Sequence, residues 1–129
     1  MPLTPAPTEV LKLATDWFNA ALSRDRDFVT AHTCTFTADW IVTIGSEPYA
    51  HYRFDDLLAH LGEVPPRRSV TSAPHGFVDG DTAWTVDFPE VDMRHDGMIT
   101  ARHTLVMRRV DGAWKVAHSH LSEGVKRLL

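Results

Sequence analysis

The sequence predicts an α+β domain in which three N-terminal helices pack on one face of a curved, mainly antiparallel sheet. Apolar residues recur with a helical period in the first half of the chain, and this period disappears after Arg67. The second half instead contains three Asp-Gly pairs, at Asp79-Gly80, Asp96-Gly97 and Asp111-Gly112, a dipeptide typical of hairpin turns. Helices that precede strands in this way indicate the α+β class, with helices on one side of the sheet.

A chain of 129 residues is the length of one domain, which we expect to span residues 8–129 after a flexible tail of residues 1–7. The first helix is expected to begin at Thr8, after a proline-rich entry. Its apolar stripe is Val10, Leu11, Ala14, Trp17, Phe18, Ala21 and Leu22.

Two shorter helices and a strand are expected next. Residues from Phe28 to His32 predict a short second helix, and residues from Ala38 to Ile44 predict a strand. The third helix buries Phe54, Leu57, Leu58 and Leu61, and we expect it to close at Gly62 in the left-handed conformation, ahead of two prolines. Beyond Arg67, four strands are expected to form an antiparallel meander.

Composition excludes several classes of function. The chain carries 13 Lys and Arg against 17 Asp and Glu, a net charge of −4, and no basic cluster suited to nucleic acid. It has no run of about 18 apolar residues, so we expect no membrane contact. Cys34 is the only cysteine, which excludes an intrachain disulfide and fits a cytoplasmic location. We also expect no cofactor.

Hairpin register predicts a row of ionisable groups on the helix-facing side of the sheet. A two-residue turn at Asp111-Gly112 pairs His103 with His120 and Leu105 with His118. The same reasoning at Asp96-Gly97 pairs Glu90 with His103 and Phe88 with Leu105. Trp84, Arg109 and Trp114 form a further row on this face. The opposite face, with Thr85, Asp87, Val91, Val106 and Leu121 among its residues, is then left for solvent or for a subunit contact.

The row of Glu90, His103 and His120, flanked by Asp92, has the residue types of general acid-base catalysis near neutral pH. A β-bulge at Pro89 is the alternative that would turn Glu90 and Asp92 outward. The two histidines have a second interpretation as a structural hydrogen-bonded pair. Two histidines and one carboxylate also form a known metal-ligand set, but the sequence lacks a tight ligand motif, and we expect no metal.

The segment Asp111-Gly112-Ala113-Trp114-Lys115-Val116-Ala117-His118-Ser119-His120-Leu121-Ser122 resembles the closing hairpin of SnoaL-like proteins, in the nuclear transport factor 2-like superfamily. The first helix leading into Ser23–Asp27, and Thr37–Ile41 at the first strand, support the likeness. The resemblance implies a cone-shaped α+β barrel, commonly dimeric, that holds a small hydrophobic molecule. It implies no single activity, because members include cyclases, dehydratases, hydrolases, isomerases and non-catalytic modules.

The resemblance also implies which residues of this chain occupy the catalytic positions of related enzymes. The catalytic histidine of scytalone dehydratase, which follows a proline, falls at Glu90, and a pocket asparagine of that enzyme falls at His103. The likeness implies an inward Glu90. The general-base aspartate of ketosteroid isomerase falls near Val42 or Thr43, where this chain has no carboxylate.

We therefore expect a cofactor-independent enzyme that performs cyclisation, dehydration or isomerisation on a small apolar carbonyl or polyketide-like compound. His103 and His120 would exchange protons, and Glu90, with Asp92, would orient an imidazole. The pocket wall would consist of Phe18, Trp40, Val42, Leu57, Leu58, Phe88, Leu105 and His118. The alternative is a non-catalytic ligand-binding or dimerisation module. In either case we expect a homodimer.

Overall fold

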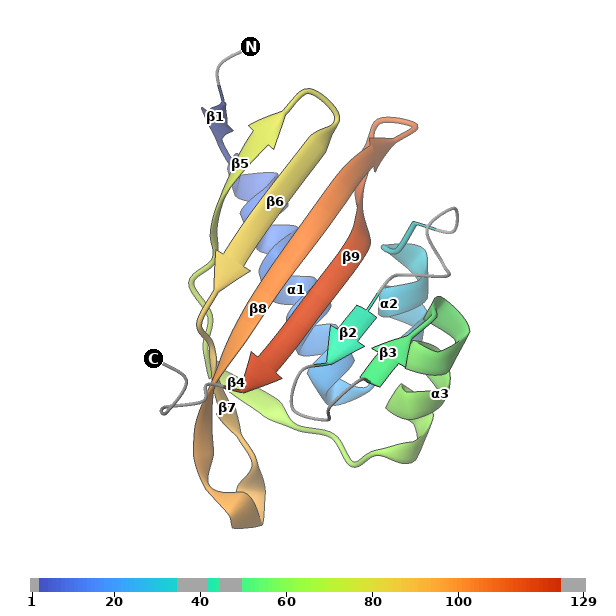
Figure 1. The fold of residues 1–129 in the computed structure, drawn as a ribbon, viewed down its shortest axis with the longest axis vertical. Helices are drawn as coiled ribbons and strands as arrows, with labels where there is room; N and C mark the ends of the chain where they lie inside the picture. The colour runs from blue at the N-terminus through green and yellow to red at the C-terminus, as the bar shows by residue number, and fades with distance from the viewer. Residues whose placement is uncertain (1–2, 35–41, 45–49, 124–129) are drawn as a thin grey trace.

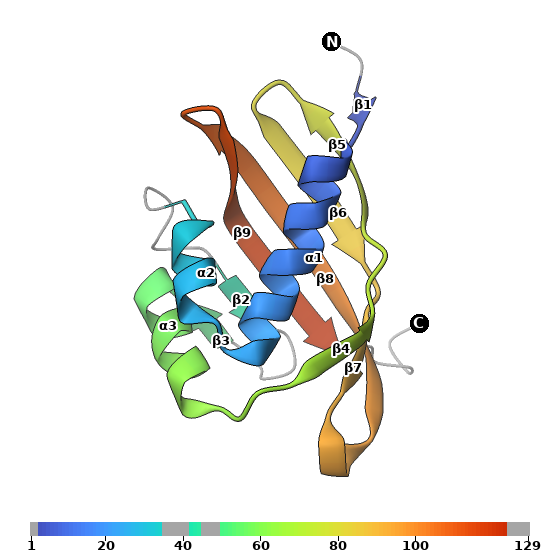
Figure 2. The same cartoon turned by 180° about the vertical axis from the view of Figure 1, so that it is seen from behind.

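The computed structural model describes residues 3–34, 42–44 and 50–123 and places its helices on one face of a curved, mainly antiparallel sheet (Figure 1). The strands follow the order β1-β5-β6-β8-β9-β2-β3, and β7 extends the sheet by pairing with β8 and with β4. Figure 2 shows α1 lying across the concave side of the sheet, with α2 and α3 beside β2 and β3. The predicted fold class is confirmed.

The three helices span Thr8–Ser23 (α1), Arg26–Ala31 (α2) and Phe54–Glu63 (α3). The start of α1 at Thr8 is as predicted, and its buried stripe includes Val10, Ala14, Trp17 and Phe18. The helix ends at Arg24, which adopts the left-handed conformation with φ 69° and donates its backbone N–H to the Ala20 and Ala21 carbonyls. This ending holds the Arg24 side chain beside the last turn of α1.

The boundaries of α2 and α3 differ from the predicted ones for local reasons. The α2 helix begins two residues early because the Asp25 carboxylate accepts the Phe28 backbone N–H at 3.1 Å and caps the helix. Gly62 lies inside α3 instead of closing it. The helix ends at Glu63, and Val64 is extended because a residue that precedes a proline disfavours the helical conformation.

The strands contain more breaks than the predicted four-strand meander. Thr4–Pro5, within the predicted tail, form β1 and pair with β5. The predicted strand over residues 38–44 is described only at its end, as β2. The remaining bounds are Val42–Ile44 (β2), Ala50–Tyr52 (β3), Arg68–Thr71 (β4), His75–Asp79 (β5), Thr82–Asp87 (β6), Glu90–Asp92 (β7), Met98–Val110 (β8) and Ala113–Glu123 (β9).

The last hairpin forms at its predicted turn, and the one before it does not. Asp111 and Gly112 have φ values of 51° and 81°, and Val110 pairs with Ala113, as a two-residue turn requires. The loop between β7 and β8, however, spans residues 93–97 and contains a 3-10 turn at Arg94–Asp96. This longer loop displaces β6 and β7 by three residues along β8.

The displaced register turns the predicted inner face of β6 and β7 outward. Asp87, not Glu90, lies opposite His103, and Glu90 lies opposite Thr100. Buried and exposed residues alternate without interruption from Asp87 to Val91, so there is no bulge at Pro89. Glu90 is on the exposed side because of the displaced register. The predicted pairs of Glu90 with His103 and of Phe88 with Leu105 are therefore wrong.

A second shift occurs in β9, where the register with β8 changes between Val106 and Met107 and leaves Ala117 as an extra residue. Beyond this bulge Ser119 lies opposite Leu105, and His120 lies opposite Thr104. Because side chains alternate between faces, one added residue reverses every later position. The predicted pairing of His103 with His120 is wrong, and Ser119 takes the inward position beside His103.

The core fills the space between α1 and the sheet. Its centre includes Val10, Trp17, Leu105, Met107 and Val116, all at most 2% exposed. A smaller cluster joins Phe18 and Leu22 to Val91 and Ala101 at the end of the sheet where β7 begins. Within the described ranges, no helix has both the length and the apolar composition needed to cross a bilayer.

Candidate active site

A small apolar cavity lies between α1, α3 and the inner face of β8 and β9. Its volume is about 70 Å³. His103 and Ser119 come from the sheet, and most of the remaining wall comes from the two helices. The lining residues are Trp17, Phe18, Ala21, Leu22, Arg24, Leu57, His60, Leu61, His103, Ser119 and Leu121.

His103 is held tightly at the sheet side of this cavity. Its ring stacks near Trp17, with centroids 6.1 Å apart and planes 17° apart, and lies 4.7 Å from the Phe18 ring. The His103 Nε2 atom and the Ser119 Oγ atom are 2.9 Å apart, a hydrogen bond whose direction depends on the tautomer. With 4% of its surface exposed, His103 has a fixed orientation inside an apolar enclosure.

Burial determines the charge state of this imidazole. Removal of the ring from water lowers the pKa of His103 to about 3, and the nearby His120 adds a smaller effect in the same direction. His103 is therefore neutral at physiological pH. A neutral imidazole has one nitrogen that accepts a proton and one that donates.

The cavity adjoins a larger outer chamber of about 250 Å³, bounded by the ends of α1, α3 and β9, the residues between α3 and β4, and the β7–β8 hairpin. Leu22, Arg24, His60 and Leu121 line both spaces, so the two spaces adjoin along these side chains. Val91, Met93, Ile99 and Ala101 give the chamber an apolar side, whereas Arg24, Arg67 and Ser122 give it a polar one. His103 lines only the inner cavity, and the larger chamber lies beside it.

The pattern of SnoaL-like domains matches residues 10–126, nearly the whole chain. The chain belongs to the SnoaL-like family. No functionally curated protein matches the sequence.

Solved structures show the same fold at low sequence identity. A nuclear transport factor 2-like protein of unknown function from Pseudomonas putida is 20% identical, covers 94% of this chain and 88% of its own, and has a TM-score of 0.68. A candidate dehydratase of that family from Streptomyces avermitilis is 19% identical, with coverages of 91% and 94% and a TM-score of 0.72. A CamKII hub homology domain from Chlamydomonas reinhardtii is 16% identical, with coverages of 91% and 97% and a TM-score of 0.71.

Three of the site residues predicted from the sequence line the inner cavity of this SnoaL-like chain: Phe18, Leu57 and His103. Leu105 is fully buried in the core beside the cavity, and Leu58 packs partly against that core. Phe88 is 64% exposed, and His118 lies on the outer face opposite Val106. Trp40 and the side chain of Val42 lie outside the described residues.

The predicted ionisable row is not assembled in this SnoaL-like structure. His120 is exposed on the outer face, and Glu90 is exposed at the edge where β7 meets β4. Asp92 instead accepts the Arg94 backbone N–H at 2.8 Å and pairs with Arg68 at 3.6 Å. Among the residues that the structure describes, no three His, Cys, Asp or Glu side chains gather as metal ligands.

Asp87 is the carboxylate that register places nearest to His103, but its oxygens are engaged elsewhere. They accept the Ser72 hydroxyl at 2.7 Å and the backbone N–H groups of Ala73 and Phe88 at 3.1 and 2.8 Å. Ser72 in turn contacts the Thr15 hydroxyl at 3.1 Å, which ties β6 to α1. Asp87 thus stabilises the α1–sheet contact and does not line the cavity.

Sequence reasoning missed Ser119, Trp17 and Arg24 as cavity residues. Trp17 was detectable, since the helical period places it one position from Phe18 on the buried stripe. The inward position of Ser119 depends on the bulge at Ala117. The only trace of this bulge in the sequence is that two consecutive apolar residues, Val116 and Ala117, interrupt the alternation, and both are buried. Arg24 depends on the left-handed end of α1, where no glycine signals that conformation.

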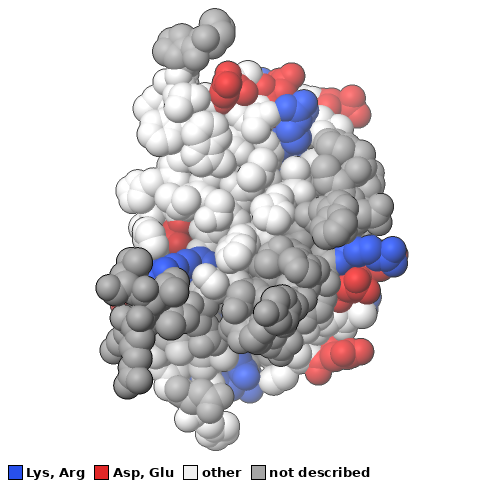
Figure 3. Space-filling model, viewed as in Figure 1, with Lys and Arg blue, Asp and Glu red and all other residues white. Residues whose placement is uncertain are grey.

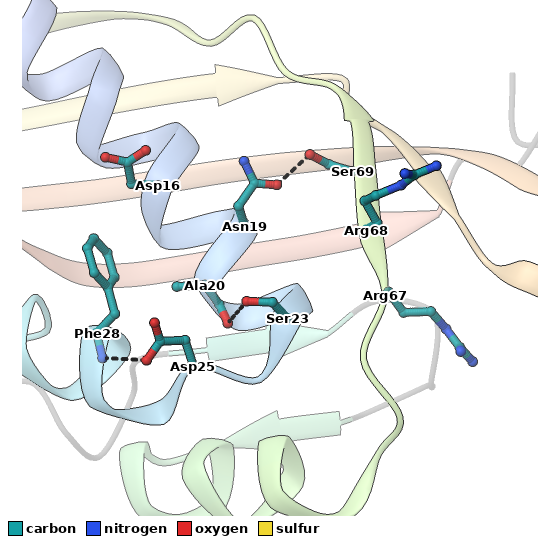
Figure 4. A pocket seen from close by; sticks show the side chains of 9 residues that line it. All are labelled: Asp16, Asn19, Ala20, Ser23, Asp25, Phe28, Arg67, Arg68 and Ser69. Carbon is teal, nitrogen blue, oxygen red and sulfur yellow. Dashed lines mark hydrogen bonds between the residues drawn. The ribbon is translucent and has the colours of Figure 1, made fainter.

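A wider surface groove of about 560 Å³ runs between α1, α2 and the β4 segment (Figure 4). Several of its polar groups are already engaged: Asn19 accepts the Ser69 hydroxyl, Asp25 caps α2, and Asp16 pairs with Lys12. His103 does not line the groove. We therefore regard the pocket beside His103 as the stronger candidate for chemistry.

Proposed function

We propose that this SnoaL-like protein is a cofactor-independent enzyme that transfers a proton within a small, largely apolar carbonyl compound. The observation that carries the proposal is a buried neutral imidazole, His103, hydrogen-bonded to Ser119 in the wall of a small apolar cavity. Apolar walls with a few fixed polar groups are typical of sites for small molecules. His120, Glu90 and Asp92 do not line this cavity, so the proposal assigns the proton to the buried His103.

In the proposed reaction His103 accepts a proton from the carbon next to the carbonyl group. It then returns the proton to another carbon of the substrate or to a departing hydroxyl group. The first outcome is an isomerisation and the second a dehydration, which is the activity named for the candidate dehydratase among the structural relatives. Ser119, Trp17 and Phe18 would keep the imidazole plane fixed during both steps.

The low pKa of His103 has two consequences for this reaction. It keeps the ring in its neutral, proton-accepting form at physiological pH. It also makes the His103 imidazole a weak base when no substrate is bound. Negative charge that develops on the substrate oxygen would raise the pKa of His103, because an opposite charge nearby stabilises the imidazolium. Proton transfer and enolate formation would therefore support each other.

The second candidate function is a non-catalytic binding or assembly module. It is favoured by the small volume of the inner cavity and by the likeness to a hub homology domain. The two functions differ in one measurable respect, because only an enzyme of the proposed class accelerates exchange of protons next to a carbonyl group.

Filling the cavity is expected to remove that exchange. Ala21 lines the cavity from α1, and a phenylalanine at this position would occupy it. We expect wild-type protein in D₂O to accelerate deuterium incorporation into a small enolisable ketone such as 2-tetralone, measured by NMR, and the Ala21→Phe variant to fall to the buffer rate.

The matched control is Ala59→Phe, the same change at an exposed position on α3. This variant should keep the wild-type rate. If wild type shows no acceleration with a panel of such ketones, or if Ala21→Phe retains it, the binding-module alternative is favoured over the enzyme.

We also propose that the protein forms a homodimer through the outer face of its sheet. The outer apolar patch consists of Phe77, Trp84, Val86 and Phe88, of which Phe77, Val86 and Phe88 are 42%, 41% and 64% exposed. Figure 3 shows that the outer surface over β5 and β6 is largely uncharged, with charged residues mainly toward the rim. A patch of large apolar residues on the surface is typical of a protein interface.

A lysine in this patch is expected to weaken the dimer. Val86→Lys would bury a charge without a partner, and we expect the dissociation constant to rise tenfold or more in analytical ultracentrifugation. Val70→Lys, on β4 and also exposed, is the matched control that should dimerise normally. A monomeric wild-type protein would contradict the proposal.

A cytoplasmic location remains part of the proposal. It is supported by the buried, unpaired Cys34, which a reducing compartment would preserve.

A further inference from the structure

The outer chamber has a strong imbalance of charge in an otherwise acidic protein. The chain as a whole has a net charge of −4. The chamber is nevertheless lined by Arg24 and Arg67, and its described lining residues include no aspartate or glutamate. A cationic, partly desolvated cleft in an anionic protein attracts negatively charged small molecules.

Arg24 is positioned by the fold and has no carboxylate partner among the described residues. Its Nε and Nη2 atoms donate to the Pro65 carbonyl oxygen at 3.1 and 2.9 Å, and its Nη1 atom donates to the Ala21 carbonyl oxygen at 2.9 Å. These three bonds fix the plane of the guanidinium. A guanidinium has five N–H donors, so two of those of Arg24 have no hydrogen-bond partner among the residues that the structure describes.

Arg67 brings a second positive charge to the same chamber. Its backbone N–H donates to the Leu22 carbonyl at 2.7 Å, a bond that joins the residue before β4 to the end of α1. Arg67 lies between the chamber and the groove of Figure 4 and lines both, and in that view its side chain extends away from Asp16 and Phe28 on the far side of the groove. Burial and the charge of Arg67 both lower the pKa of Arg24, which is the direction expected where two cations lie close together.

We propose that Arg24 and Arg67 bind a carboxylate of the ligand, so that the pocket takes an amphipathic acid with its charged end in the outer chamber and its apolar body toward His103. A carboxylate accepts parallel hydrogen bonds from a guanidinium, and Arg is suited to this role. The apolar side of the chamber, formed by Val91, Met93, Ile99 and Ala101, accommodates the body of such a ligand.

The description of this ligand as a substrate rests on the proposed function, whereas its binding does not. A carboxylate held in the chamber also adds negative charge to the pocket that contains His103. That charge would favour the protonated imidazole and strengthen His103 as a base.

Binding of a matched pair of probes tests this inference. The probes are 2-naphthoate and its neutral analogue 2-naphthamide, measured by isothermal titration calorimetry at low ionic strength. We expect wild-type protein to bind 2-naphthoate about tenfold or more tightly than 2-naphthamide, as a charge-assisted bond predicts. This preference should decrease with added salt.

Arg67→Met is the informative variant, because Arg24 also holds the chain at Pro65 and its replacement would disturb the fold. In Arg67→Met we expect the preference for 2-naphthoate to fall about tenfold while 2-naphthamide binding is unchanged. Arg68→Met removes the same charge from the next, exposed residue, which lies outside the chamber lining, and should keep the wild-type preference.

The inference is overturned if wild-type protein binds neither probe, binds both equally, or responds identically to Arg67→Met and Arg68→Met. Loss of both probes in Arg67→Met would also overturn it, since that result indicates a structural role for Arg67. Ketone exchange without a charge preference would leave the proposed function intact. A charge preference without ketone exchange would leave only the binding site.

Discussion

Acidification from pH 6.5 to about 3 is expected to destabilise the wild-type protein more than a His103→Gln variant. Burial lowers the folded-state pKa of His103 from 6.5 to about 3. Within this window the unfolded chain binds a proton at His103 that the folded protein excludes, so the free energy of unfolding falls as the pH falls. The contribution of His103 is fully present above pH 6.5 and is lost toward pH 3, with a slope of up to about 1.4 kcal/mol per pH unit.

Urea unfolding of wild type and His103→Gln at several pH values between 7 and 4 measures this effect. The variant has a constant cost from altered packing, but it lacks the titrating group, so the difference between the two proteins should shrink as the pH falls. His95→Gln is the control, because His95 is exposed and does not line the cavity, and its pH profile should follow that of wild type. Parallel profiles for wild type and His103→Gln would show that His103 is not buried as described.

The predictions for α1 and β8, which used the residue pattern of a single helix or strand, were correct, whereas those that counted strand pairs outward from the Asp96-Gly97 turn were wrong. The helical period placed α1 correctly, and the alternation along β8 placed His103, Leu105 and Met107 on the inner face, where all three are buried. These assignments are local, because each uses only the residues of one element.

The neighbours of His103 could not be predicted in the same way. They depend on the length of the β7–β8 loop and on an extra residue in β9, and the sequence specifies neither. The Asp96-Gly97 pair indicates a turn but not its length, and the observed loop over residues 93–97 displaces β6 by three residues. The bulge at Ala117 adds one residue to β9. Either event alone exchanges the faces of a strand, so Glu90 and His120 moved outward and Ser119 moved inward.

The side-chain sizes along β6 do not reveal the error in the predicted register. Trp84 and Val86 are larger and more apolar than Ala83 and Thr85, yet the small residues face α1 and the large ones face outward. Ala83 belongs to the core cluster that α1 covers and is fully buried, whereas Val86 is 41% exposed. A helix packed closely on a sheet favours small side chains beneath it, and the large side chains are then left for the proposed dimer contact.

The second large effect is expected in catalysis. If His103 carries the proton, His103→Gln should reduce the enzyme-dependent rate of deuterium incorporation by a factor of about 100 or more. Glutamine keeps a hydrogen-bonding side chain beside Ser119 but has no group that accepts and releases a proton near neutral pH. A Ser119→Ala variant should show a smaller loss, because it removes only the group that orients the ring.

The most direct test of the proposed role of His103 is the rate of deuterium incorporation into one enolisable ketone, compared between wild type, His103→Gln and His120→Gln. The cavity geometry predicts that His103→Gln falls to the buffer rate while His120→Gln, altered on the opposite face of the sheet, matches wild type. Full activity in His103→Gln, or loss of activity in His120→Gln with an unchanged fold, would contradict His103 as the proton-transfer group.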